Sequence, residues 1–139
     1  MIQSQYILDI FDLTFDDHKA SDLLRKQVDF LTITETEHTG IGLFITFSAD
    51  PGVKDYKAKR ELLVNEADNK DILEMVDGVE IKNESQNILA NAIVHLKEGI
   101  IDCLEIWNKN GENYPVVEPE NYELTQTWLG LKDKRTIKR

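Results

Sequence analysis

The segment around Glu98–Gly99 contains the pair of residues in this sequence that comes closest to catalytic chemistry. Two apolar runs flank this dipeptide, which is typical of a two-residue hairpin loop. If these two residues form the loop, His95 lies opposite Asp102 on the neighbouring strand. A carboxylate beside an imidazole fixes its tautomer and raises its basicity, as a general base requires. The sequence supplies no accompanying nucleophile or oxyanion site. A cross-strand polar contact is therefore the preferred interpretation, and a pocket near both residues is the alternative.

The remaining nucleophiles and metal ligands give no second candidate. In the same register Cys103 faces Val94 on an apolar strand face, where a thiol packs as a small hydrophobe and has a raised pKa. His18 and His38 are far apart in the sequence, whereas metal-binding histidines are closely spaced on one element. The single cysteine excludes an internal disulfide, and neither a glycine-rich phosphate loop nor a G-x-S-x-G turn is present. We therefore expect no catalytic residue, no metal and no cofactor.

The charge of the chain is strongly negative and unevenly distributed. The formal net charge is −10, from 26 acidic residues against 16 Lys and Arg. Residues 132–139, KDKRTIKR, hold five cations and one acid, a net +4, which leaves −14 on the other 131 residues. A field of that sign repels phosphates, so we expect no binding to nucleic acid. We expect the basic segment 132–139 to be a mobile tail; docking on the protein's own acidic body, or on an anionic partner, is the alternative.

Acidic and aromatic side chains could together form a surface that binds a cationic protein. The candidate residues for this surface are Glu35, Glu37, Glu105, Glu112, Glu118, Glu120, Trp107 and Tyr114. Opposite electrostatic fields speed the encounter of two proteins and suit a tight inhibitor. The simpler interpretation of the same acids is a solubilising surface.

The elements that would position these residues begin with two helices. Apolar residues spaced by three and four predict helix over residues 5–30, with a break near Thr14–Asp17 where Asp16 or Asp17 can cap the second helix. Alternating residues then predict strands over 31–38 and 41–48, with Leu31, Ile33, Glu35 and Glu37 on one face of the first and Thr32, Thr34 and Thr36 on the other. Residues 53–71 are polar, and around 56–64 they form either a short helix or a loop.

The second half of the chain predicts a meander. Strands are expected over 72–83, with a turn or bulge at Asp77–Gly78, and over 88–117 with hairpins at Glu98–Gly99 and Asn110–Gly111. The second hairpin would place Trp107 opposite Tyr114. Residues 122–131 add a strand or a docked coil. We therefore expect an α+β protein, with N-terminal helices packed on one face of an antiparallel sheet of five or six strands.

Length and hydropathy predict one domain. At 139 residues the chain can bury its own core, and we expect a single globular domain over residues 1–131. No apolar run approaches the length of a spanning helix, and the N-terminal residues lack the basic segment of a signal peptide. We expect a cytoplasmic protein that does not bind membranes. The sequence does not indicate an oligomeric state.

The hairpin HLKEGIIDCLEIWNKNGENYP, preceded by DGVEI at 77–81, resembles a pattern of small bacterial proteins. That pattern has a glycine, an apolar strand ending in Leu-Glu-Ile-aromatic, a glycine-containing turn and a proline. Some proteins of this sort are similar to immunity proteins of bacterial toxin systems, including contact-dependent growth inhibition. The resemblance covers residues 72–117 and implies a small cytoplasmic protein that binds and blocks a toxin domain, often a basic nuclease. It assigns no functional residue.

Two hypotheses follow for the function of the chain. The first is a non-enzymatic acidic module that binds protein, most concretely an immunity protein for a cognate basic toxin domain. The second is a small enzyme or ligand-binding protein with a pocket near His95 and Asp102. They differ in whether those two side chains point into a cavity.

Overall fold

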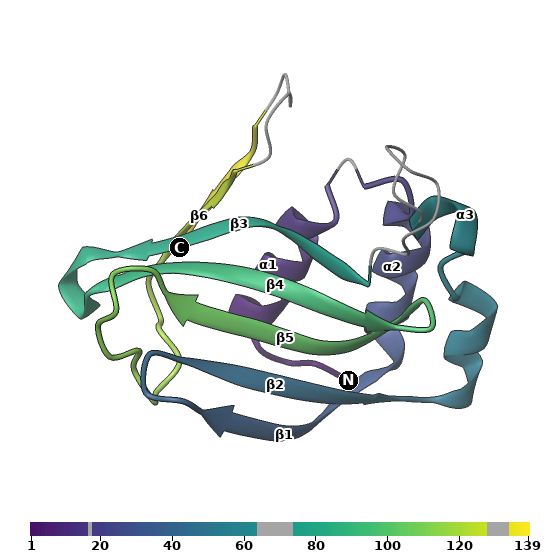
Figure 1. The fold of residues 1–139 in the computed structure, drawn as a ribbon, viewed down its shortest axis with the longest axis horizontal. Coiled ribbons are helices and arrows are strands. Elements are labelled where there is room, and N and C mark those ends of the chain that lie inside the picture. Colours follow the sequence, from purple (N-terminus) through teal and green to yellow (C-terminus); the bar gives the residue numbers. More distant parts are fainter. Residues whose placement is uncertain (17, 64–73, 128–133) are drawn as a thin grey trace.

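A seven-stranded antiparallel sheet, covered on one face by two N-terminal helices, forms the body of the protein (Figure 1). The computed structural model describes residues 1–16, 18–63, 74–127 and 134–139. The predicted α+β class, with N-terminal helices on one face of an antiparallel sheet, is confirmed. The sheet has seven strands where the sequence predicted five or six.

The helices and strands of the described residues follow the predicted order as far as residue 108. The helices are α1 (Gln5–Thr14), α2 (Ser21–Gln27) and α3 (Arg60–Leu63), with 3-10 turns at Val28–Phe30, Pro51–Tyr56 and Glu84–Gln86. The strands are β1 (Leu31–His38), β2 (Gly42–Ala49), β3 (Met75–Asn83), β4 (Ile88–Lys97), β5 (Ile100–Asn108), β6 (Glu123–Gln126) and β7 (Thr136–Lys138). The predicted elements at 53–71, 72–83 and 122–131 lie partly outside the described residues, over 64–71, 72–73 and 128–131.

The strand order is β1-β2-β5-β4-β3-β6-β7, so a central three-stranded unit lies between two hairpins. Strands β3, β4 and β5 form a central meander, the β1–β2 hairpin pairs with β5, and the β6–β7 hairpin pairs with β3. The prediction of a third meander strand after Asn110–Gly111 is wrong, because β2 takes that place beside β5. The chain after the turn is a loop, and the Tyr114 amide donates to the Gly40 carbonyl at 2.8 Å.

Helix α1 supplies much of the core. Ser4 caps it by accepting a hydrogen bond from the Ile7 amide, and the helix buries one apolar side, which includes Ile10 and Phe11. It lies across β3, β4 and β6, where the small side chains of Ala90 and Ala92 allow a close approach. Helix α2 packs near β5. The core therefore lies between these helices and one face of the sheet.

The break between the helices is where the sequence places it, but its predicted cap is not formed. The N-cap of α2 is Ala20, which makes no side-chain capping bond. Asp16 instead accepts hydrogen bonds from Arg25 and Arg135, and Asp17 lies outside the described residues. The Asp16 carboxylate, predicted to cap the second helix, therefore binds two arginine side chains instead.

Residues 134–139 lie in the sheet, where the sequence predicted a mobile tail. Strand β7 pairs with β6, and two arginines fix the segment to helix α1. Arg135 donates to Asp16 at 2.9 Å and to Asp12 at 3.0 Å, while Arg139 donates to Asp9 at 2.8 and 3.0 Å. The alternative of docking on the protein's own acidic body is therefore what the described part of the tail does; Lys132 and Asp133 lie outside it.

Asp9 is the buried centre of this attachment. Its carboxylate accepts hydrogen bonds from Gln5 and Tyr122, both at 2.7 Å, in addition to those from Arg139. Burial alone would raise the pKa of Asp9, but the hydrogen bonds from Arg139, Tyr122 and Gln5 outweigh it and lower that pKa below its ordinary value. The folded state therefore favours the ionised carboxylate.

We predict that Asp9→Asn lowers the free energy of unfolding by about 2 to 3 kcal/mol at neutral pH, because charged hydrogen bonds to Arg139 and Tyr122 are weakened. The pKa of Asp9 is lower in the folded than in the unfolded chain, so this stabilisation is complete above about pH 4 and is lost as the pH falls through the folded-state pKa. Urea unfolding at about pH 7 and pH 3 measures both effects.

The exposed Asp50→Asn serves as the control and should change stability by less than about 0.5 kcal/mol. A gap between wild type and Asp9→Asn that stays constant or widens at acid pH would contradict the assignment.

Candidate functional site

A bulge in β5 decides which side chains of the central hairpin face solvent. The predicted turn at Glu98–Gly99 is confirmed, with φ of 53° and 80°, and Leu96 pairs with Ile101 as expected. Beyond that pair the register shifts, so that His95 pairs with Cys103 rather than with Asp102. A shift of one residue moves every following side chain to the opposite face. The predicted pairing of His95 with Asp102 would have put Cys103, Glu105 and Trp107 on the helix side; that pairing is wrong, and all three face the other way.

The bulge follows from the positions of the apolar residues in IIDCLEIW. With it, Ile101, Leu104 and Ile106 all point into the core and are at most 2% exposed. A regular strand starting at Ile101 would bury Glu105 and turn Leu104 and Ile106 outward. Burying an unpaired carboxylate costs several kcal/mol, so the extra residue at Asp102–Cys103 is the less costly solution.

Gln27 of α2 holds the turn that precedes this bulge. The side chain is fully buried, and its amide group donates to the carbonyls of Tyr56 and Gly99, both at 2.9 Å. Its oxygen accepts from the Ile101 amide at 2.8 Å. A side chain at Gly99 would meet the Ala58 carbonyl at 2.5 Å, so the close packing requires glycine. The turn is thus fixed from the helix side.

A second bulge re-phases the edge strand β1. The register shifts between Ile33 and Glu35, leaving Thr34 as the extra residue, whose hydroxyl donates to the Thr46 carbonyl at 3.2 Å. Before the bulge Ile33 faces the helix side; after it Glu35 and Glu37 face the opposite side. The prediction that Ile33 and Glu35 share a face is therefore wrong. The third bulge, at Asp77–Gly78 in β3, was predicted and is confirmed by the shift between Val76 and Val79.

The two bulges in β1 and β5 place acids and apolar side chains together on the face of the sheet opposite the helices. We call this surface the open face; its central residues are Glu35, Glu37, Phe44, Thr46, Ile93, His95, Cys103, Glu105 and Trp107. One row across the strands runs Glu37–Phe44–Glu105–Ile93, and the next runs Glu35–Thr46–Cys103–His95.

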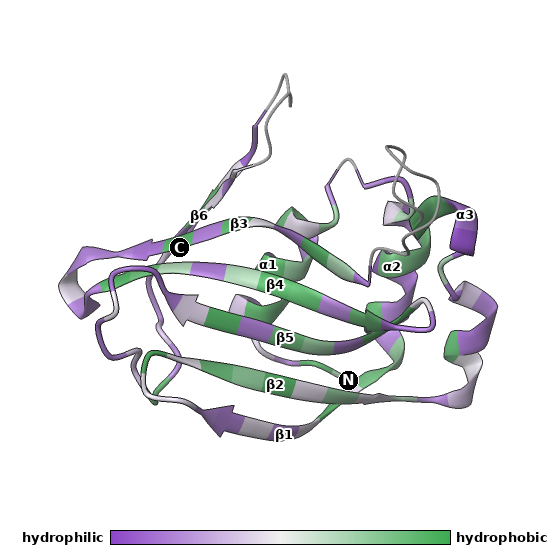
Figure 2. Ribbon diagram, in the orientation of Figure 1, coloured by the Kyte–Doolittle hydropathy of each residue, from purple (hydrophilic) through white to green (hydrophobic). Residues whose placement is uncertain are grey.

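The open face is uncovered and chemically mixed. Viewed from this side, helices α1 and α2 lie behind the sheet, and no helix of the described residues lies in front of it (Figure 1). Both apolar and polar residues occur along β2, β5 and β4 (Figure 2). Phe44, Ile93 and Trp107 are half-buried by their neighbours, so each presents part of an apolar side chain to solvent. The surface is therefore open and does not enclose a site.

His95 makes its polar contact with Glu105 instead of with Asp102. The His95 Nε2 lies 2.9 Å from Glu105 Oε1, and the two side chains are 31% and 28% exposed. Both are therefore on the surface. The described part of the structure has cavities of about 310, 290, 210 and 160 Å³, and all four are lined by other residues. A pocket near His95 and Asp102 gains no support from this geometry.

Cys103 lies beside this pair on the open face. Burial raises the pKa of its thiol, and the neighbouring Asp102 and Glu105 carboxylates raise it further. A thiol with a raised pKa is a poor nucleophile at neutral pH. The predicted position of Cys103 opposite Val94 is wrong, because Cys103 pairs with His95.

Four of the eight predicted partner-binding residues come together on the open face, namely Glu35, Glu37, Glu105 and Trp107. The others lie in or beside the loop after β5. Glu112 and Glu120 are exposed there, and Glu118 accepts a hydrogen bond from the Ser4 hydroxyl. Tyr114 is buried and its hydroxyl is paired with that of Tyr6, so it does not oppose Trp107. Burial raises the pKa of Tyr114 to about 12.

Two apolar members of the open face were missed by sequence reasoning, Phe44 and Ile93. Phe44 stands out of phase with Leu43 and Ile45, and alternation along this strand is the signal that could have found it. Ile93 was not among the residues predicted to bind a partner, and it pairs with Glu105 on the open face. Ile93 belongs to this surface because Glu105 lies beside it there.

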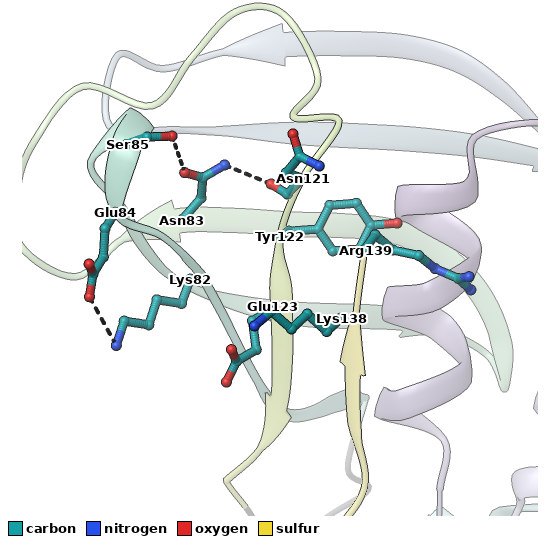
Figure 3. Close-up of a pocket in the computed structure, with 9 residues that line it drawn as sticks. All are labelled: Lys82, Asn83, Glu84, Ser85, Asn121, Tyr122, Glu123, Lys138 and Arg139. Carbon is teal, nitrogen blue, oxygen red and sulfur yellow. Dashed lines mark hydrogen bonds and ion pairs between the residues drawn. The ribbon is translucent and has the colours of Figure 1, made fainter.

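A depression at the other end of the sheet has a different character. It is an open depression of about 310 Å³ at the β3–β6–β7 end of the sheet, lined by Lys82, Glu84, Glu123 and Lys138 among others (Figure 3). Lys82 pairs with Glu84 at 3.4 Å, and the guanidinium of Arg139 reaches toward α1, where it binds Asp9. Charges of both signs line the depression, so it does not select a ligand of one charge.

The described residues contain neither a metal-binding cluster nor a membrane-spanning helix. No group of three or more His, Cys, Asp or Glu side chains there is arranged to hold a metal ion. None of the described helices has the length and apolar character needed to span a membrane. Comparison with known proteins found no family model, curated protein or solved structure that matches the chain.

We predict that Trp107→Ala lowers the free energy of unfolding by only about 1 to 2 kcal/mol, because the indole is half-buried on the open face. Leu104→Ala is the matched control three residues earlier on the same strand, and the loss of its fully buried side chain should cost about 3 to 5 kcal/mol. Urea unfolding of both variants provides the comparison. A larger loss for Trp107→Ala than for Leu104→Ala would place the indole in the core.

Proposed function

We propose that this chain is a non-enzymatic protein-binding module whose open face binds a cationic protein. The observation that carries the proposal is the combination of Phe44, Ile93 and Trp107 with the carboxylates of Glu35, Glu37 and Glu105 on a sheet face that no described helix covers. Tryptophan is enriched among residues that dominate binding energy, and surrounding polar residues exclude water from such a centre. The acids supply the electrostatic attraction that speeds encounter.

The charges on this face support a cationic partner in particular. Glu105 is paired with His95, and Glu80 at the margin is paired with Lys109. Glu35 and Glu37 form no ion pair with any described residue, and both are exposed on the edge strand. Their charges are therefore available to a partner. The overall charge of −10 acts in the same direction at long range.

Within this class we propose an immunity protein that neutralises a cognate basic toxin domain in the cytoplasm. The support is the resemblance of the β3–β5 region to such proteins together with the acidic open face. An enzyme or small-ligand protein with its site at His95 and Asp102 remains the alternative. It would need a cavity at those residues, and the His95–Glu105 contact lies on an open surface instead.

The proposal is tested by mixing the protein with the toxin domain encoded beside its gene. We predict a complex with a Kd below about 1 µM, whose association slows as salt is raised. Trp107→Ala should weaken the complex by about 30-fold or more, as expected for a central aromatic anchor. Isothermal titration calorimetry gives the affinity, and survival of cells that express the toxin gives the neutralisation.

Val117→Ala is the control for the loss of an exposed apolar side chain, since Val117 is 77% exposed in the loop after β5 and is not part of the open face. It should leave the Kd within about threefold. Absence of a complex at micromolar concentrations would contradict the immunity assignment. Equal losses in the Val117 and Trp107 variants would contradict the open face as the binding surface.

A further inference from the structure

The edge strand β1 has an outer side that the described residues leave without a strand partner. Among the described strands it is the first in the sheet order and pairs only with β2. Seven of its eight residues, all except Leu31, are exposed. An edge strand of this length presents backbone amide and carbonyl groups that can pair with an added strand. The long strand β1 is therefore a place where a partner could extend the sheet.

The bulge at Thr34 gives this edge two chemically different sides. Glu35 and Glu37 project to the open face, while Ile33, Thr36 and His38 project to the helix side. Because side chains alternate along a strand, a segment added beside β1 would direct every second residue toward the two carboxylates. The residues between them would point to the helix side.

The helix side of this edge contains a mostly apolar cavity of about 210 Å³. Ile33, Leu43 and Ile45 line it from the sheet, Tyr6 and Ile7 from α1, and Val116 from the loop after β5. Helix α1 contacts mainly β3, β4 and β6, so this part of the sheet lies at the margin of the helix layer. Ile33 is 39% exposed and Val116 is 73% exposed at the cavity. An apolar side chain of an added strand could enter it.

We propose that the cationic partner binds by strand addition to β1, through an extended segment in which basic and apolar residues alternate. The basic side chains face Glu35 and Glu37, and the apolar ones enter the cavity beside Ile33. Main-chain hydrogen bonds supply affinity in this mode, and the alternating side chains supply selectivity. The inference rests on the proposed function and specifies its binding mode.

A second copy of this chain fits the edge less well than a basic segment does. Two β1 strands paired antiparallel would bring Glu35 and Glu37 of one copy against the same residues of the other on one face of the extended sheet. Like charges placed opposite each other on neighbouring strands are destabilising. The acids thus favour a cationic segment and oppose self-association.

The test uses the full chain and an eight-residue peptide of alternating lysine and leucine, acetylated and amidated at its ends. We predict micromolar binding by calorimetry at low salt, about tenfold weaker for Glu35→Gln/Glu37→Gln. The control Glu112→Gln/Glu120→Gln removes the same charge from the loop and should bind as wild type does. A lysine–serine peptide should bind about tenfold more weakly, since it offers nothing to the cavity.

Hydrogen exchange of backbone amides distinguishes strand addition from capture by charge alone. Bound peptide should slow the exchange of outward-facing amides within residues 31–38. Binding without protection of those amides, or equal binding by the two double variants, would overturn the inference. Protection of the same amides in the free protein, with a dimer in sedimentation, would assign the edge to a second copy and overturn it too.

Failure of this experiment does not remove the proposed function. If the toxin domain still binds and Trp107→Ala still weakens the complex, the open face remains the binding surface and only the strand-addition mode is lost. If the toxin domain does not bind at all, the function itself fails whatever the peptide does.

Discussion

The cost of burying a carboxylate determines the surface of this protein. In β5 the apolar residues Ile101, Leu104 and Ile106 can all reach the core only if one residue is inserted between the first two, and that insertion turns Glu105 outward. Cys103 and Trp107 follow Glu105 to the same side because side chains alternate. Gln27 fixes the adjacent turn through two buried hydrogen bonds, one to the Gly99 carbonyl and one from the Ile101 amide, so the register is anchored from the helix layer.

The same constraint acts in the edge strand. Leu31 and Ile33 face the core side, and the bulge at Thr34 prevents Glu35 and Glu37 from following them. The two bulged strands lie on either side of β2, so their outward acids meet around Phe44 in one row. The open face is thus a consequence of core packing, and the proposed partner surface depends on it. Elsewhere acids are used differently: Asp9, Asp12 and Asp16 hold the C-terminal strand by binding Arg135 and Arg139.

The sequence was sufficient for the fold class, the positions of both N-terminal helices, most strands and the bulge at Asp77–Gly78, because periodicity and turn residues are local signals. Four of the eight residues named for the candidate surface lie together on one face of the sheet, namely Glu35, Glu37, Glu105 and Trp107. The prediction failed at His95 and Asp102, because the pairing predicted from the turn did not allow for an extra residue in β5. It failed at Tyr114 because β2, and not a third meander strand, pairs with β5. Asp-Gly marks a bulge by its turn chemistry, whereas Asp102–Cys103 and Thr34 have no such mark and follow only from tertiary packing. The docking of Arg135 and Arg139 also needed partners more than a hundred residues away.

The central claim is that β5 carries a bulge at Asp102–Cys103, which sends Glu105 and Trp107 to the open face. Nuclear Overhauser effects between protons of paired strands measure this register directly. The account predicts cross-strand contacts of His95 with Cys103, Ile93 with Glu105 and Asn91 with Trp107. Contacts of His95 with Asp102 and of Ala92 with Glu105 would instead indicate an unbulged strand, with Glu105 and Trp107 toward the helices, and would contradict the account.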